Sequence, residues 1–220
     1  RKINAFIFGL KQRVKNPKIK VPGFKLIHIP DVDYETNYIS FKDALIEIKE
    51  WSDTHPLHIP IFINIEACSY TLRRESNFLK FLGFSKTIPF NKDVYNQFNQ
   101  EILDVFSTAK KKLFTPKILR DTCKNIKTRL NTYGWPSLNS CLGKIIFILE
   151  GDNCAVYRKL IENGENMPMF VYGSPNDNST AFLLRNHSIG HEKEMAELAN
   201  SYILRTRSDA GTYEARDINY

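Results

Sequence analysis

The chain has 220 residues, of which 42% are hydrophobic and 25% are charged. This composition is typical of a globular protein with a sizeable core, and it excludes a largely disordered chain. No run of about 18 apolar residues occurs, so the sequence predicts no transmembrane segment.

The net charge of +7 is unevenly distributed. Residues 1–20 carry seven Lys or Arg and no acid, and residues 108–129 carry eight Lys or Arg and one acid, Asp121. Such segments are either solvated helix faces or a surface for an anionic partner. No zinc-finger or RNA-recognition motif is present, so we expect no nucleic-acid partner.

Five short apolar runs predict β-strands. They are rich in β-branched residues and largely lack polar alternation, which is typical of strands buried on both faces of a parallel sheet. The runs are 25–29 (KLIHI), 61–65 (IFINI), 145–149 (IIFIL), 169–172 (MFVY) and 202–204 (YIL).

Amphipathic segments between these runs predict helices. Ser40 and Asp43 form a plausible capping box for the first helix, and Thr115 with Pro116 suits the start of the third. The predicted helices cover residues 41–51, 93–113, a segment from 115 with an apolar stripe to residue 130, 153–162 and 192–199.

The alternation of strands and helices predicts right-handed βαβ units in one α/β domain covering 1–220. An open sheet and a (β/α)8 barrel both satisfy this order. No GxGxxG or GxxxxGK[ST] motif follows a strand, which disfavours a nucleotide-binding open sheet. Residues 67–114 lack a clear strand and are predicted to be an insertion-like region.

Polar side chains follow the predicted strands, where the active sites of parallel barrels lie. An imidazole can transfer protons, carboxylates can bind a hard cation, and guanidinium groups suit phosphate. Together they favour phosphoryl chemistry. The residues are His28, Asp31 and Asp33; Asn64 and Glu66; Glu150 and Asp152; Tyr172; and Arg205, Arg207 and Asp209.

A structural role stays open for several of these residues. His28 could be a hydrogen-bonded core histidine, and Asp31 and Asp33 could shape a turn. Arg205 and its neighbours could form a structural ion-pair cluster. For Glu66 a functional role is favoured, because a carboxylate that ends a buried strand is costly without a partner.

Residues 26–66 resemble the Ca²⁺-dependent phosphoinositide phospholipase C family, which belongs to the phospholipase-C-like phosphodiesterase superfamily of TIM barrels. The segments GWPSL (134–138), GK (143–144) leading into IIFILEG, MPMFVYG (167–173) and LRTRSD (204–209) resemble the same family. The resemblance covers nearly all of the chain from about residue 21, except for about 67–110.

The resemblance implies cleavage of a phosphoinositide to diacylglycerol and inositol phosphate with Ca²⁺ as cofactor. His28 would be the second of two catalytic histidines, and Glu66 would bind the cation. Arg205, Arg207 and Asp209 are candidates for substrate binding. The partners would be the lipid substrate and an anionic membrane surface, and the resemblance favours secretion.

The five predicted strands correspond to strands three to seven of the family barrel. The first histidine and the other metal-binding carboxylates come from the family's first two strands. We therefore expect a barrel fragment that is inactive on its own.

Two alternatives remain at this point. A glycerophosphodiester phosphodiesterase shares the barrel and the cation. A non-catalytic module that binds anionic lipid would explain the two basic segments without chemistry.

Overall fold

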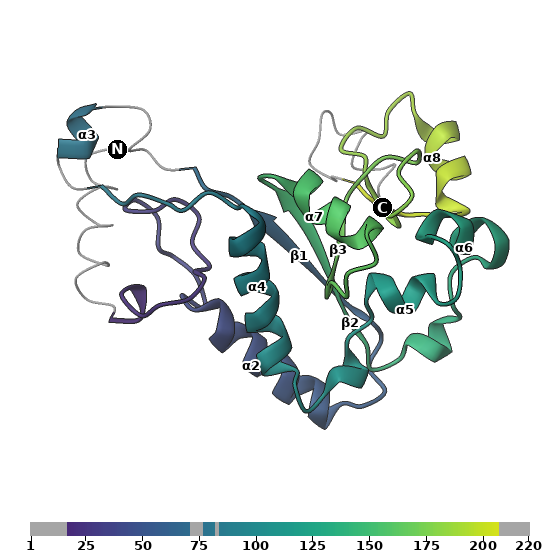
Figure 1. Cartoon of the computed structure of the whole chain (residues 1–220), viewed down its shortest axis with the longest axis horizontal. Coiled ribbons are helices and arrows are strands. Elements are labelled where there is room, and N and C mark those ends of the chain that lie inside the picture. The colour runs from purple at the N-terminus through teal and green to yellow at the C-terminus, as the bar shows by residue number, and fades with distance from the viewer. Residues whose placement is uncertain (1–16, 71–76, 82–83, 207–220) are drawn as a thin grey trace. The chain divides into compact units, whose positions relative to one another are not determined.

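The computed structural model describes residues 17–70, 77–81 and 84–206, and the chain divides into two compact units. Unit 1 contains the described residues within 1–56 and 68–110, and unit 2 contains those within 57–67 and from 111 onward (Figure 1). The assignment of one domain with an insertion at about 67–114 stays a prediction.

Unit 1 is built around two helices, α2 (Phe41–Thr54) and α4 (Lys92–Val105). Ser40 caps α2 by accepting a hydrogen bond from the Asp43 N–H at 3.3 Å, which confirms the predicted helix start. The rings of Phe41 and Phe98 stack at 4.6 Å and join the two helices. Unit 1 also contains the short η1 (Pro17–Ile19) and α3 (Asn77–Phe81).

The prediction of a strand at residues 25–29 is wrong. This segment makes only isolated antiparallel bridges, between Lys25 and Ser40 and between Ile29 and Asp33. The chain reverses at Pro30 and Asp31, and Asp31 has a positive φ of 67°. The segment therefore makes single bridges to residues 33 and 40 of its own loop and is not part of a sheet in the described residues.

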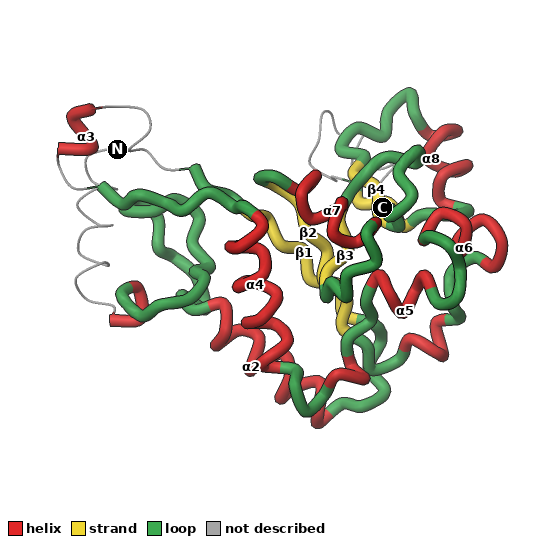
Figure 2. The backbone as a smooth tube through the Cα atoms, viewed as in Figure 1, coloured by secondary structure: helices red, strands yellow, loops and turns green. Residues whose placement is uncertain are grey.

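The strands of unit 2 are parallel, as predicted, and Figure 2 shows the first three side by side. The sheet order is β1-β2-β3, with Ile61 opposite Ile145, and a second pair joins β4 to β5. A parallel bridge between Tyr172 and Phe182 links the end of β3 to β4. The strands are β1 (Ile61–Ala67), β2 (Ile145–Gly151), β3 (Met169–Val171), β4 (Phe182–Leu184) and β5 (Ile203–Arg205).

Strand β4 has no counterpart in the sequence prediction. It is three residues long and follows the polar run 176–180, so its pattern is too short to show periodicity. Strand β2 is buried along Ile145–Leu149, as predicted, whereas β1 is not buried on both faces. Side chains of β1 alternate between half-buried and exposed, as at Phe62, so one face of this strand is uncovered. Within the described residues β1 pairs with β2 alone.

Helices of unit 2 surround these strands. The predicted start at Thr115 is confirmed, because Thr115 accepts a hydrogen bond from the Ile118 N–H. Asp121, with φ 54°, ends α5, and α6 begins anew after Asn125. The helices are η3 (Lys110–Lys112), α5 (Pro116–Arg120), α6 (Ile126–Tyr133), η4 (Leu138–Cys141), α7 (Cys154–Glu162) and α8 (Glu192–Ala199).

The architecture is a mixed α/β fold with parallel strand pairing. The described residues show no closed barrel. A search of the same residues for a helix long and apolar enough to cross a membrane gives none.

Candidate active site

Polar side chains of unit 2 gather where the parallel strands end. Asn64 and Glu66 lie on β1, Glu150 on β2, Tyr172 directly after β3, and Arg205 at the end of β5. The register places Glu66 opposite Glu150. The carboxyl ends of parallel strands form one rim, which is where such folds bind ligands.

Arg205 is the centre of a polar network at this rim. Its Nη1 donates to Glu150 Oε1 at 2.5 Å, and its guanidinium carbon lies 5.9 Å from the ring centroid of Tyr172. In the amide orientation that satisfies both neighbours, Asn64 accepts from Arg205 Nη1 at 2.8 Å and from Nε at 3.1 Å. The Asn64 amide nitrogen then donates to Tyr172 Oη at 2.8 Å.

The electrostatics of the network keep its two donors protonated. Burial raises the pKa of Tyr172 above its ordinary value of 10.0, although the nearby Arg205 charge opposes this. For Arg205, burial alone would lower the pKa, but the hydrogen bond and charge of Glu150 raise it overall. A neutral phenol and a permanent cation therefore face the rim, and both suit an anionic oxygen.

Glu66 provides the unengaged carboxylate of this rim. It is exposed, and the part of the chain that the structure describes gives it no hydrogen bond or ion pair. Its register neighbour Glu150 is held by Arg205. The expectation of a carboxylate ending a strand buried on both faces is corrected, since β1 is half exposed.

A calcium ion takes about six to eight oxygen ligands. Glu66 fits as one of them, because its carboxylate is free and solvent-accessible. No cluster of three or more His, Cys, Asp or Glu able to hold a metal occurs among the described residues.

In unit 1, His28 is paired with a carboxylate. Its Nδ1 lies 2.9 Å from Asp33 Oδ2, and its side chain is 75% exposed. The hydrogen bond from His28 lowers the pKa of Asp33 below its ordinary value of 3.8. The pair orients the imidazole and leaves Nε2 available for an external group.

Asp31 has a structural role. It is 1% exposed, and its carboxylate accepts hydrogen bonds from the Ser85 N–H at 2.6 Å and the Ser85 hydroxyl at 2.8 Å. It thereby fixes the turn that places Asp33 next to His28. The sequence offered both aspartates as turn residues, and the structure distinguishes them, because Asp31 is buried against Ser85 whereas Asp33 contacts His28.

The predicted site residues fall into three groups. Arg205 and Glu66 lie at one rim in unit 2, His28 belongs to unit 1, and Arg207 and Asp209 lie outside the described residues. The structure adds Asn64, Glu150 and Tyr172 to the Arg205 network. The sequence placed these three residues at predicted strand ends, but it did not predict that they contact Arg205 or one another.

The parallel α/β fold and the polar rim are typical of enzymes that bind ligands at the carboxyl ends of their strands. The sequence model of one family, described as phosphoinositide phospholipase C, Ca²⁺-dependent, matches residues 3–220. The chain belongs to this family. No curated protein matches it significantly in sequence.

Solved structures of similar fold include two bacterial enzymes. A Ca²⁺-dependent phosphatidylinositol-specific phospholipase C from Streptomyces antibioticus has a TM-score of 0.57 and 16% identity over 78% of this chain. A calcium-dependent phosphoinositol-specific phospholipase C from Pseudomonas sp. has a TM-score of 0.57 and 19% identity over 82%. The matches cover 59% and 62% of those two chains.

Proposed function

We propose that the protein acts as a Ca²⁺-dependent phosphatidylinositol-specific phospholipase C. The reaction would convert a phosphoinositide to diacylglycerol and an inositol phosphate. The family match over residues 3–220 carries this proposal. The rim of unit 2 supports it, because it joins a free carboxylate to a network of phosphate-binding donors.

We also propose that unit 2 is part of a (β/α)8 barrel. The strands of unit 2 pair in parallel and in chain order from β1 to β3, and a bridge leads on to β4 and β5. This order is expected for successive strands of a (β/α)8 barrel. The five strands would then be five of the eight of such a barrel, with the insertion-like region between β1 and β2.

Proton transfer is assigned to His28. In its doubly protonated form the ring keeps its Nδ1 proton directed at Asp33 and can donate the Nε2 proton to the leaving diacylglycerol oxygen. Asp33 acts as a positioning residue, since it touches only the imidazole. Such a general acid typically contributes about 10²–10⁴ in rate.

The residues at the rim of unit 2 would stabilise the negative charge of the phosphate group. Bound Ca²⁺, with Glu66 among its ligands, would lower the pKa of the attacking inositol 2-hydroxyl and offset developing charge. The hydroxyl proton would pass to the first of the two histidines that the family resemblance implies. Arg205 binds a phosphate oxygen, and Glu150 and Asn64 hold its guanidinium in place. Arg207 and Asp209 remain proposed substrate-binding residues on the strength of the family resemblance.

The test is an assay of the full-length protein that contains this chain, on phosphatidylinositol in mixed micelles with Ca²⁺ or with a chelator. We expect turnover that requires Ca²⁺, and a loss of about 10²-fold or more in His28→Ala and Glu66→Gln. His55→Ala and Glu197→Gln are matched controls, because His55 stacks on Trp51 and Glu197 lies on the exposed helix α8.

Three outcomes would contradict the proposal. Turnover of glycerophosphodiesters alone would indicate a glycerophosphodiester phosphodiesterase. Turnover that persists in the chelator would remove the role of Ca²⁺. Absence of turnover on both substrate classes would leave this chain a non-catalytic lipid-binding module.

Peripheral contact with an anionic membrane is part of the proposal. The three consecutive lysines of η3 (Lys110–Lys112) support it, because clustered cations are attracted to anionic lipid. Sedimentation with vesicles should show binding that increases with the fraction of anionic lipid and falls with added salt. Binding indifferent to both would contradict it.

A further inference from the structure

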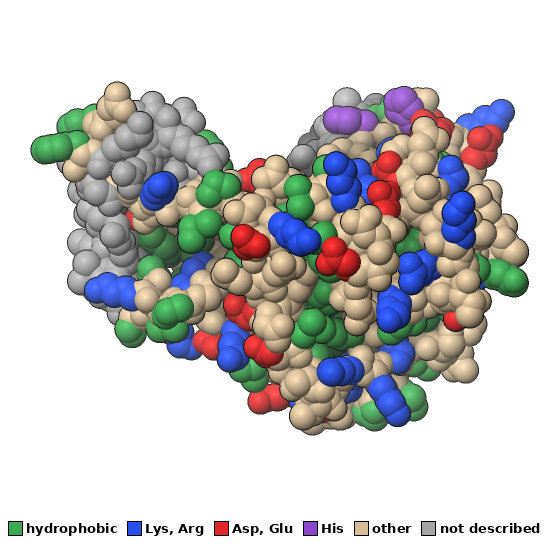
Figure 3. Space-filling model, in the orientation of Figure 1, with side chains coloured by type: hydrophobic (Ala, Val, Ile, Leu, Met, Phe, Trp, Pro, Cys, Tyr) green, Lys and Arg blue, Asp and Glu red, His purple; other side chains and the backbone are tan. Residues whose placement is uncertain are grey.

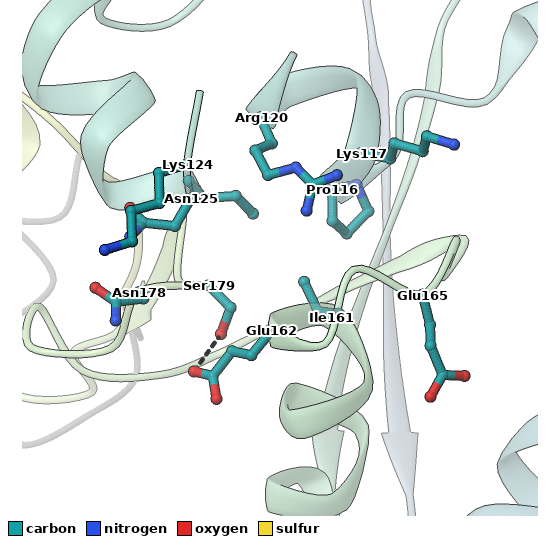
Figure 4. Close-up of a pocket in the computed structure, with 11 residues that line it drawn as sticks. Pro116, Lys117, Arg120, Lys124, Asn125, Ile161, Glu162, Glu165, Asn178 and Ser179 are labelled. Atoms are coloured by element: carbon teal, nitrogen blue, oxygen red, sulfur yellow. Dashed lines mark hydrogen bonds between the residues drawn. The ribbon is translucent and has the colours of Figure 1, made fainter. Parts of the chain in front are cut away.

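A polar cavity of about 200 Å³ lies in unit 2, at some distance along the fold from the rim. Four segments line the cavity: α5, the residues around the start of α6, the end of α7 with the loop after it, and the residues just before β4 (Figure 4). It is lined by Pro116, Lys117, Arg120, Lys124, Asn125, Ile126, Ile161, Glu162, Glu165, Asn178 and Ser179.

The cavity lies at the amino-terminal side of the strands. Leu113, just before α5, pairs with Ile145, the first residue of β2. Glu165 precedes the start of β3, and Ser179 precedes the start of β4. Glu66 and Glu150 mark the opposite, carboxyl-terminal side, so the cavity is separate from the proposed active site.

A cation with no counter-ion lies in this cavity. Figure 4 shows the Arg120 side chain extending into the middle of the lining residues. Arg120 is half-buried, and among the described residues it has neither a hydrogen-bond partner nor an ion pair. A partly desolvated guanidinium without a carboxylate is unfavourable unless an anion binds to it.

The two lysines and two glutamates of the rest of the lining balance in charge, so the net positive charge of the cavity is that of Arg120. Lys124 lies next to Asn178, whereas the side chains of Lys117 and Glu165 are directed away from the centre (Figure 4). Glu162 is the carboxylate that faces the cavity, and its Oε1 already accepts a hydrogen bond from the Ser179 hydroxyl at 3.2 Å. Figure 3 shows Lys and Arg side chains gathered over α5 and α6.

The backbone around the cavity is fixed by several contacts. The Lys127 N–H donates to the Asn178 carbonyl at 3.1 Å, which joins α6 to the segment before β4. Ser179 is 4% exposed, and Asn125 caps α6 through the Thr128 N–H at 2.8 Å. The backbone segments that carry Asn125 and Asn178 are therefore fixed before a ligand arrives, whereas the Arg120 side chain is oriented only when an anion binds.

We propose that this cavity binds a phosphomonoester dianion. The Arg120 guanidinium would bind two phosphate oxygens in its fork, and Lys124 would neutralise the second charge. The Asn178 amide supplies a neutral donor. The phosphate comes either from a soluble metabolite or from the headgroup of a phosphomonoester lipid, and the site makes no use of the residues at the rim.

The test is calorimetric titration of the whole chain with inorganic phosphate at constant ionic strength. We expect one site, weakened about tenfold or more in Arg120→Ala and weakened less in Arg120→Lys, which keeps the charge and loses the fork. Lys193→Ala on exposed α8 is the matched control and should bind like the unmodified protein. Thermal melts should show that phosphate raises the Tm of all variants except Arg120→Ala.

Two results of the phosphate titration would overturn the proposal, and a third comes from the vesicle comparison below. One is the absence of saturable phosphate binding, and the other is equal affinity in Arg120→Ala and the unmodified protein. The source is decided by comparing glycerol phosphate in solution with vesicles that contain phosphatidic acid or phosphatidylinositol. Preference for phosphatidic acid over soluble phosphates identifies a lipid headgroup, and equal binding to both vesicles contradicts recognition of a monoester.

Discussion

At the scale of single residues, the contact between His28 and Asp33 orients the imidazole ring but adds little to the stability of the folded protein. The His28 side chain is 75% exposed and that of Asp33 is 38% exposed, so the ion pair contributes little to folding. Its effect is on the imidazole, because an Nδ1 proton held by Asp33 fixes the tautomer and leaves Nε2 for chemistry. The pair is therefore best probed by titration.

Replacing His28 with Ala should raise the pKa of Asp33 towards its ordinary value of 3.8, because the hydrogen bond that lowers it is removed. The depressed pKa means that the pair stabilises the fold above about pH 4 and that this contribution is lost as the pH falls through the folded value. An NMR titration of the Asp33 carboxyl carbon measures this.

His55→Ala serves as the control for this titration, since His55 stacks on Trp51 and not on Asp33. An Asp33 pKa that is the same in His28→Ala and in the unmodified protein would contradict the assigned hydrogen bond.

Residue patterns predicted part of the site and not all of it. Arg205 and Glu66 were identifiable because polar residues that end apolar runs lie at strand termini. Asp33 was also a candidate, but its contact with His28 could not be predicted, because the contact depends on how the chain reverses at Asp31. Asn64 joins Arg205 to Tyr172 through neighbours more than 100 positions along the chain, which single-sequence reasoning cannot pair.

At the scale of elements, the ends of β1 and β2 are joined by a close backbone approach. Gly151 has φ 104° and pairs with Ala67. The Ala67 carbonyl accepts a hydrogen bond from the Asp152 N–H at 2.7 Å. A Cβ at position 151 would overlap that carbonyl and lie 2.9 Å from its carbon, so this crossing requires glycine.

Gly151→Ala should therefore destabilise the protein by about 3 kcal/mol or more, through backbone strain and the lost approach to Ala67. Gly134→Ala is the matched control. Gly134 also has a positive φ, 66°, but a Cβ there would meet no atom within 4 Å. We expect it to cost about 1–2 kcal/mol.

Chemical denaturation of the two variants and of the unmodified protein measures their free energies of unfolding. The difference between the variants gives the cost of the overlap with Ala67 beyond that of backbone strain. If Gly151→Ala is no less stable than Gly134→Ala, the overlap with Ala67 does not govern this position.

Element starts were more predictable than element extents. Ser40 and Thr115 cap their helices as expected, because a cap is a local hydrogen bond. The helix expected over 93–113 ends at Val105, and the one from Thr115 divides at Asp121. In these cases, and in the non-strand at 25–29, tertiary contacts outweigh the local pattern.

At the scale of the whole molecule, the backbone amides best protected against hydrogen exchange should be those in the sheet of unit 2. Strand β2 is paired on both sides and its residues Ile145–Leu149 are at most 3% exposed. Residues 25–33 make only isolated bridges. Amide exchange requires opening of the hydrogen bonds, and the most buried strand opens last.

Hydrogen–deuterium exchange followed by mass spectrometry should show peptides covering 145–149 among the slowest to exchange. Peptides covering 25–33 should exchange much faster, and those of β1 should lie in between, because β1 is paired on one side within the described residues. Equal rates for β1 and β2 would mean that β1 is covered on its other edge.

The pairing of β1 with β2 also has a consequence for how the chain folds. Ile61 meets Ile145, 84 positions further along, and most of the intervening chain belongs to unit 1. Closing so long a loop is entropically costly and slows the search for the sheet. Helix α4 lies within that loop and packs on α2, so early collapse of these helices would shorten the effective loop. The rate at which the sheet forms should thus depend on how fast unit 1 becomes compact.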